Sequence, residues 1–250
     1  MKIQICSDLH LEFPRNRSWI EQNPLIPTGE ILIVAGDTQD LNRDFAELAF
    51  IQWASDHFES VYLIPGNHEY YGGYDASSAR QAFNTKIMSN VFLVNNQTIE
   101  FDTFKLICAT MWSHIQQYPQ VVAQHLTDFH RIRFEGRRLS IENYNAMHRY
   151  AFDYLTQEIQ KPGKKVVVTH HLPSNFCNAP EFHNSLLNEA FCVDHTQFIS
   201  NHEIDYWIYG HSHRNLDDFK IGNTTMLTNQ LGYVHMGEHG TFARDKVFTI

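Results

Sequence analysis

Short hydrophobic runs recur along the chain and alternate with stretches that carry hydrophobic residues at helical spacing. The runs ILIVA at 31–35 and VVVT at 166–169 are unbroken, which is typical of strands buried on both faces. Strands are predicted at residues 2–6, 31–35, 61–64, 91–94, 99–101, 104–109, 166–169, 206–209, 219–221 and 224–228. The first predicted strands alternate with predicted helices, which predicts a core of parallel strands. The later strands follow one another closely, which predicts antiparallel strands added to that core. We expect one mixed α/β domain, residues 1–250, with two sheets.

Four stretches have the hydrophobic spacing of helices, namely residues 43–58, 75–88, 140–160 and 184–200. In the third, the hydrophobic positions are Tyr144, Met147, Ala151, Leu155 and Ile159. Ser140 is the expected N-cap of this helix. Residues 114–139 and 172–183 are predicted to be long loops, and loops of that length are often functional.

Composition narrows the class of protein. The chain has 19 basic and 28 acidic residues, a formal charge of −9 and a pI near 5.9, which argues against duplex nucleic acid as the main ligand. No hydrophobic run approaches the roughly 18 residues of a membrane span, and the N-terminal residues do not resemble a signal peptide. Four scattered cysteines fit small core residues in a reducing cytoplasm. The unusual count is 16 histidines.

Polar residues follow five of the predicted strands, at the point where each strand ends. The segments are SDLH at 7–10, GDTQD at 36–40, GNHE at 66–69, THH at 169–171 and GHSH at 210–213. In open α/β sheets the ligand crevice lies outside the carboxyl ends of the strands, so these segments are expected to meet. An Asp-x-His pair arises by chance about once in such a chain, but a Gly-Asn-His-acid tetrad only about 0.006 times.

The residue types at these strand ends suit a metal centre. Carboxylate, amide oxygen and imidazole ligands together favour Mn, Fe or Zn. Glycines at 36, 66 and 210 would let the backbone turn sharply where the ligands converge. Seven ligands exceed what one ion with an open position needs, and they fit two ions about 3.5–4 Å apart that share a carboxylate. The candidate ligands are Asp8, His10, Asp37, Asn67, His170, His211 and His213.

These segments, in this order, resemble the calcineurin-like metallophosphoesterase superfamily, whose pattern is D-x-H, G-D-x-x-D, G-N-H-[ED], a later H and G-H-x-H. The resemblance spans residues 8–213 and implies a four-layer α/β/β/α sandwich of two mixed sheets flanked by helices. It implies that one ion is held by Asp8, His10 and His213. It implies that the other is held by Asn67, His170 and His211, and that Asp37 bridges the two. His68 corresponds to the catalytic histidine of the family, and Asp40 to the acid that pairs with it.

One departure from the family pattern concerns the residues after Asp40. Protein phosphatases of the superfamily carry Arg-Gly there, whereas this chain has Leu41 and Asn42. The arginine that grips the phosphate is therefore absent from this position, and the chain looks closer to the small bacterial phosphoesterases.

Several neighbouring residues have interpretations of their own. Glu69 is expected to brace its loop. His171 follows a predicted ligand, and it can either belong to the site or point away from it. Core packing is expected of Tyr70, Tyr71 and Trp112, and helix-surface positions of His57, His148 and His202. A cluster of basic residues has two interpretations, a solvated loop or a contact to the phosphate of the substrate. It consists of Arg131, Arg133, Arg137 and Arg138.

The resulting hypothesis is a metal-dependent phosphoesterase that acts on a small phosphate ester. A hydroxide bridging the two ions would attack phosphorus, and Asn67 would help to stabilise the phosphoryl charge. His68 would protonate the leaving oxygen. The metal motifs leave open whether the enzyme is a phosphomonoesterase or a cyclic-nucleotide or other phosphodiesterase. A nuclease and a non-catalytic binding scaffold are further alternatives, the second disfavoured because no motif residue is lost.

Overall fold

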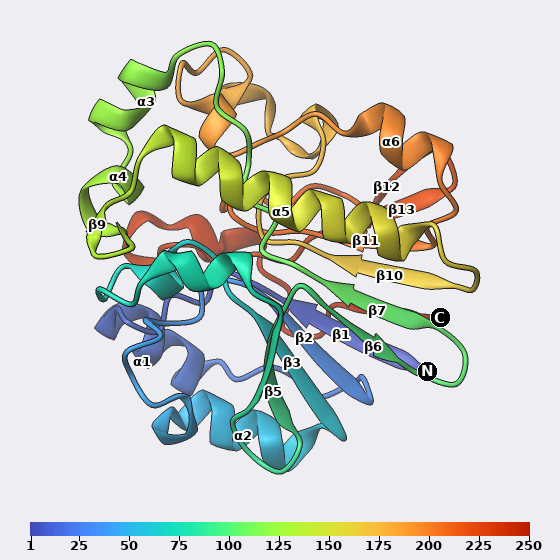
Figure 1. The fold of residues 1–250 in the computed structure, drawn as a ribbon. Coiled ribbons are helices and arrows are strands. Elements are labelled where there is room, and N and C mark those ends of the chain that lie inside the picture. The colour runs from blue at the N-terminus through green and yellow to red at the C-terminus, as the bar shows by residue number, and fades with distance from the viewer.

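Two six-stranded sheets form the centre of the computed structural model, which describes all 250 residues (Figure 1). The first sheet has the order β14 (Val247–Thr249), β1 (Lys2–Cys6), β2 (Ile31–Ala35), β3 (Ser60–Ile64), β5 (Val91–Asn95) and β4 (Phe83–Lys86). The second has the order β12 (Phe219–Ile221), β13 (Thr224–Leu227), β11 (Tyr206–Ile208), β10 (Lys165–Val168), β7 (Lys105–Cys108) and β6 (Gln97–Glu100). In each sheet the four inner strands are parallel and the two edge strands antiparallel.

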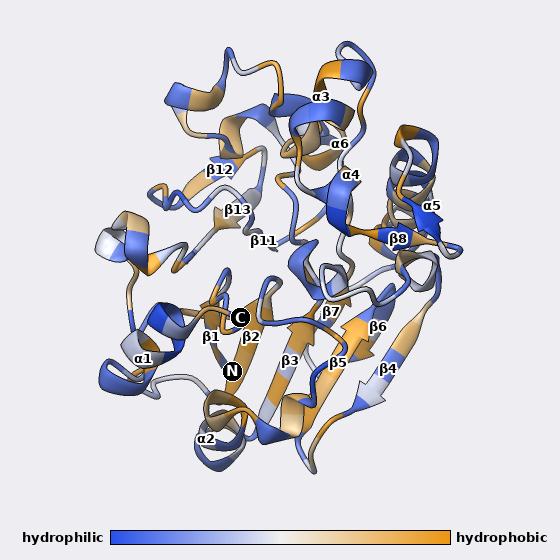
Figure 2. Cartoon of the chain, turned by 90° about the vertical axis from the view of Figure 1, so that its left-hand side faces the viewer, coloured by the Kyte–Doolittle hydropathy of each residue, from blue (hydrophilic) through white to orange (hydrophobic).

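Strand β2 illustrates why the unbroken hydrophobic runs form buried strands. Its side chains alternate between two hydrophobic layers. Leu32 and Val34 pack with Phe50 on the outer face of the first sheet, whereas Ile33 packs with Val166 of the second sheet. The hydrophobic colouring of the first sheet in Figure 2 follows from this burial on both sides. The expected pair of mixed sheets is confirmed.

Helices cover the outer faces of both sheets. The first sheet carries α1 (Pro14–Gln22) and α2 (Ala49–His57), and the second carries α5 (Ile141–Ile159) and α6 (Thr196–Asn201) (Figure 1). Ser140 caps α5 as predicted, because its side chain accepts a hydrogen bond from the backbone N–H of Asn143. The layers are therefore α/β/β/α, as the family resemblance implied. No helix is long and apolar enough to cross a membrane.

Two predicted helices are wrong. Residues 75–88 form only a short 3-10 turn, Ala76–Arg80, followed by β4, whose backbone pairs with β5. Residues 184–200 are helical only at 188–190 and in α6, because the segment is tied to Leu172 instead. The backbone N–H of Leu172 donates to Phe191, and that of Val193 donates to Leu172.

Other elements had no signal in the hydrophobic pattern. Helix α1 and strand β14 were not predicted, and the helix expected at 43–58 begins as an α-helix only at Ala49. The predicted loop 114–139 contains α3 (Pro119–His125), α4 (Asp128–Arg131) and the hairpin of β8 (Arg133–Phe134) and β9 (Arg137–Arg138). His148, expected on a helix surface, is buried and bonds the carbonyl of Trp112.

Candidate metal centre

The five polar segments meet at the carboxyl ends of the parallel strands, and their side chains form two clusters. The ligand atoms within each cluster lie within 4.8 Å of one another. We call the first cluster the first position, and it consists of Asp8, His10, Asp37 and His213. We call the second cluster the second position, and it consists of Asp37, His170 and His211, with the amide oxygen of Asn67 3.3 Å from His170 Nε2. The structure therefore brings all seven predicted ligands together, in the two predicted groups.

Asp37 is the residue common to both clusters, and its two carboxylate oxygens face different histidines. Its Oδ2 atom is 3.7 Å from His10 Nε2, and its Oδ1 atom is 3.4 Å from His170 Nε2. One carboxylate thus points an oxygen toward each position, which is the arrangement that a bridging ligand requires.

The two histidines of the first position turn one ring nitrogen each toward a common point. His10 Nδ1 lies 3.1 Å from Glu12, and His213 Nδ1 lies 2.7 Å from Glu238, so each of these Nδ1 atoms donates to a carboxylate. The two Nε2 atoms face each other at 2.9 Å. A proton on one ring joins them in a hydrogen bond, and without that proton both Nε2 atoms offer lone pairs that a divalent ion can accept. These residues therefore fit a metal ion.

The second position is oriented by a backbone carbonyl and an amide. His170 Nδ1 donates to the carbonyl of Ala35 (2.9 Å), which directs its Nε2 toward His211 Nδ1 at 3.1 Å. Asn67 Nδ2 donates to Asp128 (2.9 Å), which turns the amide oxygen of Asn67 toward His170. Oxygen and imidazole donors without a thiolate suit Mn, Fe or Zn.

The backbone at the site is strained in a way that the sequence did not indicate. Five of the seven candidate ligands have a positive φ angle although none is glycine, and these are Asp8, His10, Asp37, His211 and His213, at 54°, 47°, 55°, 77° and 54°. Such conformations cost of the order of 1–3 kcal/mol each and cluster at functional sites. Of the three glycines, only Gly36 has a positive φ. Gly66 and Gly210 instead make room, because a Cβ there would lie 2.1 Å from Asp37 and 2.6 Å from Asp8.

Glu69 braces the loops of the site, as predicted. Its buried carboxylate accepts the backbone N–H groups of Asp37 (3.0 Å), Thr38 (2.7 Å) and Gly66 (2.6 Å). Burial, followed by the charge of Asp37, raises the pKa of Glu69, and the amide hydrogen bonds oppose that rise. Glu69 therefore joins the ends of β2 and β3 without facing the ligands.

His68 lies beside the clusters, with both ring nitrogens engaged. Its Nδ1 is 2.8 Å from Glu12 and its Nε2 is 3.2 Å from the hydroxyl of Tyr233. Burial lowers the pKa of His68, but the charge of Asp37 and the bond to Glu12 outweigh that effect and raise the pKa to about 9. Cations bound at Asp37 would oppose this rise. In the structure the ring is thus held in a position where it can carry a proton.

The structure does not pair Asp40 with His68 as the family pattern implied. Asp40 lies 3.4 Å from Arg43, and both nitrogens of His68 have other partners. Glu12 occupies the place expected of Asp40. Its signal in the sequence is slight, since it lies two residues beyond the Asp-x-His motif, in the loop that leads into α1.

Tyr71 packs against the hydrophobic cluster of Tyr70 and Trp112, as expected, but it also faces the site. Its hydroxyl donates to Asp128 (2.5 Å), and its ring lies 4.1 Å from that of His68. Burial raises the pKa of Asp128, and its hydrogen bonds oppose the rise. Asp128, Tyr233 and Glu238 were not predicted, because nothing in their local sequence marks them.

The structure places His171 and the basic cluster, whose roles the sequence left open. His171 turns its Nε2 toward Tyr144 (3.2 Å) and is not part of either position. Of the basic cluster, Arg131 alone lines a cavity beside His68, and Arg133, Arg137 and Arg138 are exposed on the β8–β9 hairpin.

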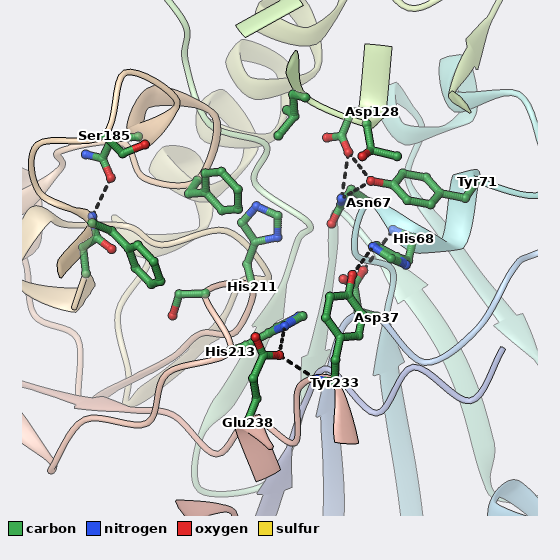
Figure 3. Close-up of a pocket in the computed structure, with 17 residues that line it drawn as sticks. Asp37, Asn67, His68, Tyr71, Asp128, Ser185, His211, His213, Tyr233 and Glu238 are labelled. Carbon is green, nitrogen blue, oxygen red and sulfur yellow. Dashed lines mark hydrogen bonds and ion pairs between the residues drawn. The ribbon is translucent and has the colours of Figure 1, made fainter. Parts of the chain in front are cut away.

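A cavity of about 290 Å³ opens over the ligands (Figure 3). Its floor carries Asp37, Asn67, His211 and His213, and its wall comes from the segments around α4 and 178–191. The wall is hydrophobic or neutral over much of its area, and includes Leu126, Asn178, Phe182, Ser185, Asn188 and Phe191. No lysine or arginine lines it.

Comparisons with known proteins agree with this geometry. The sequence model of the calcineurin-like phosphoesterase family matches residues 1–215. The chain is 30% identical over 205 residues to the uncharacterized protein L509 of Acanthamoeba polyphaga mimivirus, covering 74% of this chain and 72% of that protein.

A solved structure at low sequence identity shares the fold. The phosphopantetheinyl hydrolase of Mycobacterium tuberculosis superposes with a TM-score of 0.63 at 15% identity, over 94% of this chain and 90% of that one. A dimetal phosphatase of Danio rerio has a TM-score of 0.46 at 14% identity, over 92% and 87%. The family match covers most of the chain, including all five ligand segments. The chain belongs to the calcineurin-like phosphoesterase family.

Proposed function

We propose that this chain hydrolyses small phosphodiesters at the two ion positions, with His68 as the general acid. The observation that carries the proposal is the pair of clusters joined by Asp37, with His68 beside them and a cavity above. Divalent ions at these positions would supply Lewis-acid activation of water and of the phosphoryl group.

The residues of the chain have separate parts in this proposal. Asn67 lines the cavity floor through its amide, which Asp128 holds in place, so it can contact a phosphoryl oxygen as well as an ion. His68 lines the same cavity and can give its proton to the leaving oxygen. An ester bound against this wall would have less contact with bulk water, which would strengthen these electrostatic contacts.

The charge of the cavity favours a diester over a monoester. A monoester dianion brings one more negative charge than a diester, and a buried charge needs a partner. Beyond the charge that the two ions would supply, the cavity offers no cationic side chain besides histidine, and the carboxylates of Asp128 and Glu238 line it. A diester monoanion therefore suits the lining better.

A second cavity, of about 450 Å³, gives the other ester group a place. It shares His68, Tyr71, Thr127 and Tyr233 with the first cavity and adds Arg131 and Arg43. A diester bound at the ions can extend one organic group over Phe182 and Phe191 and the other past His68.

The test is a substrate panel on protein stripped of metal and reloaded with Mn²⁺, Fe²⁺, Zn²⁺, Ni²⁺ or Mg²⁺. Bis-p-nitrophenyl phosphate and a cyclic nucleotide represent diesters, and p-nitrophenyl phosphate represents monoesters. We expect a higher kcat/KM on the diesters, with Mn²⁺, Fe²⁺ or Zn²⁺ best. Faster hydrolysis of the monoester would overturn the diester assignment. No hydrolysis of any ester with any ion would overturn the proposed function.

A further inference from the structure

Glu12 is held in place by a rigid stretch of backbone between β1 and α1. The backbone N–H of His10 donates to Asp37 (2.9 Å), and that of Leu11 donates to Thr38 (2.7 Å). The Leu11 side chain is buried in the hydrophobic layer beneath the first sheet. The loop that carries Glu12 is therefore fixed to the loop that carries Asp37.

One carboxylate oxygen of Glu12 contacts two histidines. Its Oε1 lies 2.8 Å from His68 Nδ1 and 3.1 Å from His10 Nδ1, and the side chain is 11% exposed. An ionised carboxylate only accepts hydrogen bonds, so both Nδ1 atoms donate to it. The opposite nitrogens then face the site, that of His10 toward His213 and that of His68 toward Tyr233.

From this geometry we propose that Glu12 is the positioning residue of His68, and that it couples the orientation of the general acid to the ligand His10. The inference rests on the proposed function for the role of His68. Glu12 thus fulfils the part that the family pattern assigned to Asp40, from a different loop.

The contacts of Glu12 suit positioning better than a simple ion pair. One oxygen, Oε1, contacts both imidazoles, while the other, Oε2, is buried and contacts no protein donor. Partners behind histidines fix the tautomer and the ring orientation of the imidazole.

The test compares Glu12→Ala with Glu12→Gln in fully metal-loaded protein. With alanine we expect kcat on a diester with an alkyl or nucleoside leaving group to fall about 10- to 100-fold. The fall on bis-p-nitrophenyl phosphate should be much smaller, because p-nitrophenolate leaves without a proton. Glutamine keeps an acceptor oxygen at the same place and should restore most of the rate. Glu21→Gln, on the exposed face of α1, is the matched control.

A double variant shows whether Glu12 acts through His68. If it does, adding Glu12→Ala to His68→Ala should cost little further rate, since interacting residues are not additive. Additive losses, or equal losses on both substrates, would overturn the proposal. The proposal would also be overturned if kcat of Asp40→Asn fell in a way that depended on the leaving group and kcat of Glu12→Ala did not.

A spectroscopic readout keeps the inference independent of turnover. In Zn²⁺-loaded protein, ¹⁵N NMR should find the His68 Nδ1 proton protected from exchange in the wild type and exposed in Glu12→Ala. Protection that survives in the alanine variant would contradict the proposal even if no substrate were found. Failure of hydrolysis with protection intact would instead count against the proposed function alone.

Discussion

The two ion positions share Asp37 but differ in charge. The first adds Asp8, and the Nδ1 atoms of both of its histidines donate to carboxylates, Glu12 and Glu238. In the second position, His170 is backed by a neutral backbone carbonyl, and Asn67 replaces a second carboxylate ligand. Carboxylates behind imidazoles raise the basicity of the ligands. We therefore expect the first position to bind its ion more tightly than the second.

This difference suggests a division of labour. Both positions border the cavity, the second through Asn67 and His211 and the first through His213, but Asp8 and His10 of the first position do not line it. A tightly held ion in the first position would keep the centre assembled. A more weakly held ion beside Asn67 would have more freedom to exchange ligands with a phosphate ester. The following variants test this comparison.

Removal of the shared ligand should have the largest effect. Asp37→Asn takes away the carboxylate that faces both positions, so both ions should be lost and hydrolysis should fall to background. Elemental analysis after dialysis measures the first effect and a diester assay the second. A variant that retained two ions per chain would show that Asp37 does not bridge them.

Variants specific to one position come next. His213→Ala should empty the first position and Asn67→Ala the second, leaving one ion per chain in each case. Loss of one ion removes several kcal/mol of transition-state stabilisation, so activity should fall about 10³-fold or more. Titration with a chelator should strip the ion of Asn67→Ala less easily than that of His213→Ala. The reverse order would contradict the expected difference in affinity.

His68→Ala separates chemistry from metal binding, since His68 belongs to neither position in the family assignment. Both ions should stay bound, and kcat on an alkyl or nucleoside diester should fall about 10²- to 10⁴-fold. The loss on bis-p-nitrophenyl phosphate should be much smaller. Equal losses on both substrates with the ions retained would make His68 an electrostatic residue rather than the acid.

The smallest effect is expected from the carboxylate behind His213. Glu238→Gln keeps a hydrogen-bond acceptor but removes the charge. The affinity of the first position for its metal ion should therefore fall about 10- to 100-fold, while the rate of hydrolysis at saturating metal should change little. A metal titration of activity measures this shift. Asp128→Asn is the corresponding variant at the second position. If both variants lowered the affinity for the metal ion equally, the proposed difference between the two positions would be wrong.

Local patterns in the sequence predicted the sheets, the meeting of the candidate ligands and the bracing by Glu69, but not the other side chains that hold those ligands. The run ILIVA could be predicted as a strand because it is an unbroken hydrophobic stretch. Each of the five polar segments could be found because it is a short, continuous stretch of sequence. The supporting contacts span long separations, 56 residues between Glu12 and His68 and 61 between Asn67 and Asp128. No periodicity encodes such a contact, which depends on how distant loops meet.

The errors in secondary structure have a similar origin. Residues 83–86 form a strand because β5 offers an open edge, and the backbone pairing outweighs helical spacing. Asp75 reinforces the turn before it, since its carboxylate accepts the backbone N–H groups of Ser77, Glu135 and Gly136. Two of those three partners come from the β8–β9 hairpin, about which the local sequence holds no information.

The central claim is that two ions share Asp37, and anomalous scattering from crystals of Zn²⁺-loaded protein tests it most directly. The account predicts two peaks about 3.5–4 Å apart. One should lie about 2.0–2.2 Å from ligand atoms of Asp8, His10 and His213, and the other at similar distances from Asn67, His170 and His211. A single peak, or a second peak without a contact to Asp37, would contradict it.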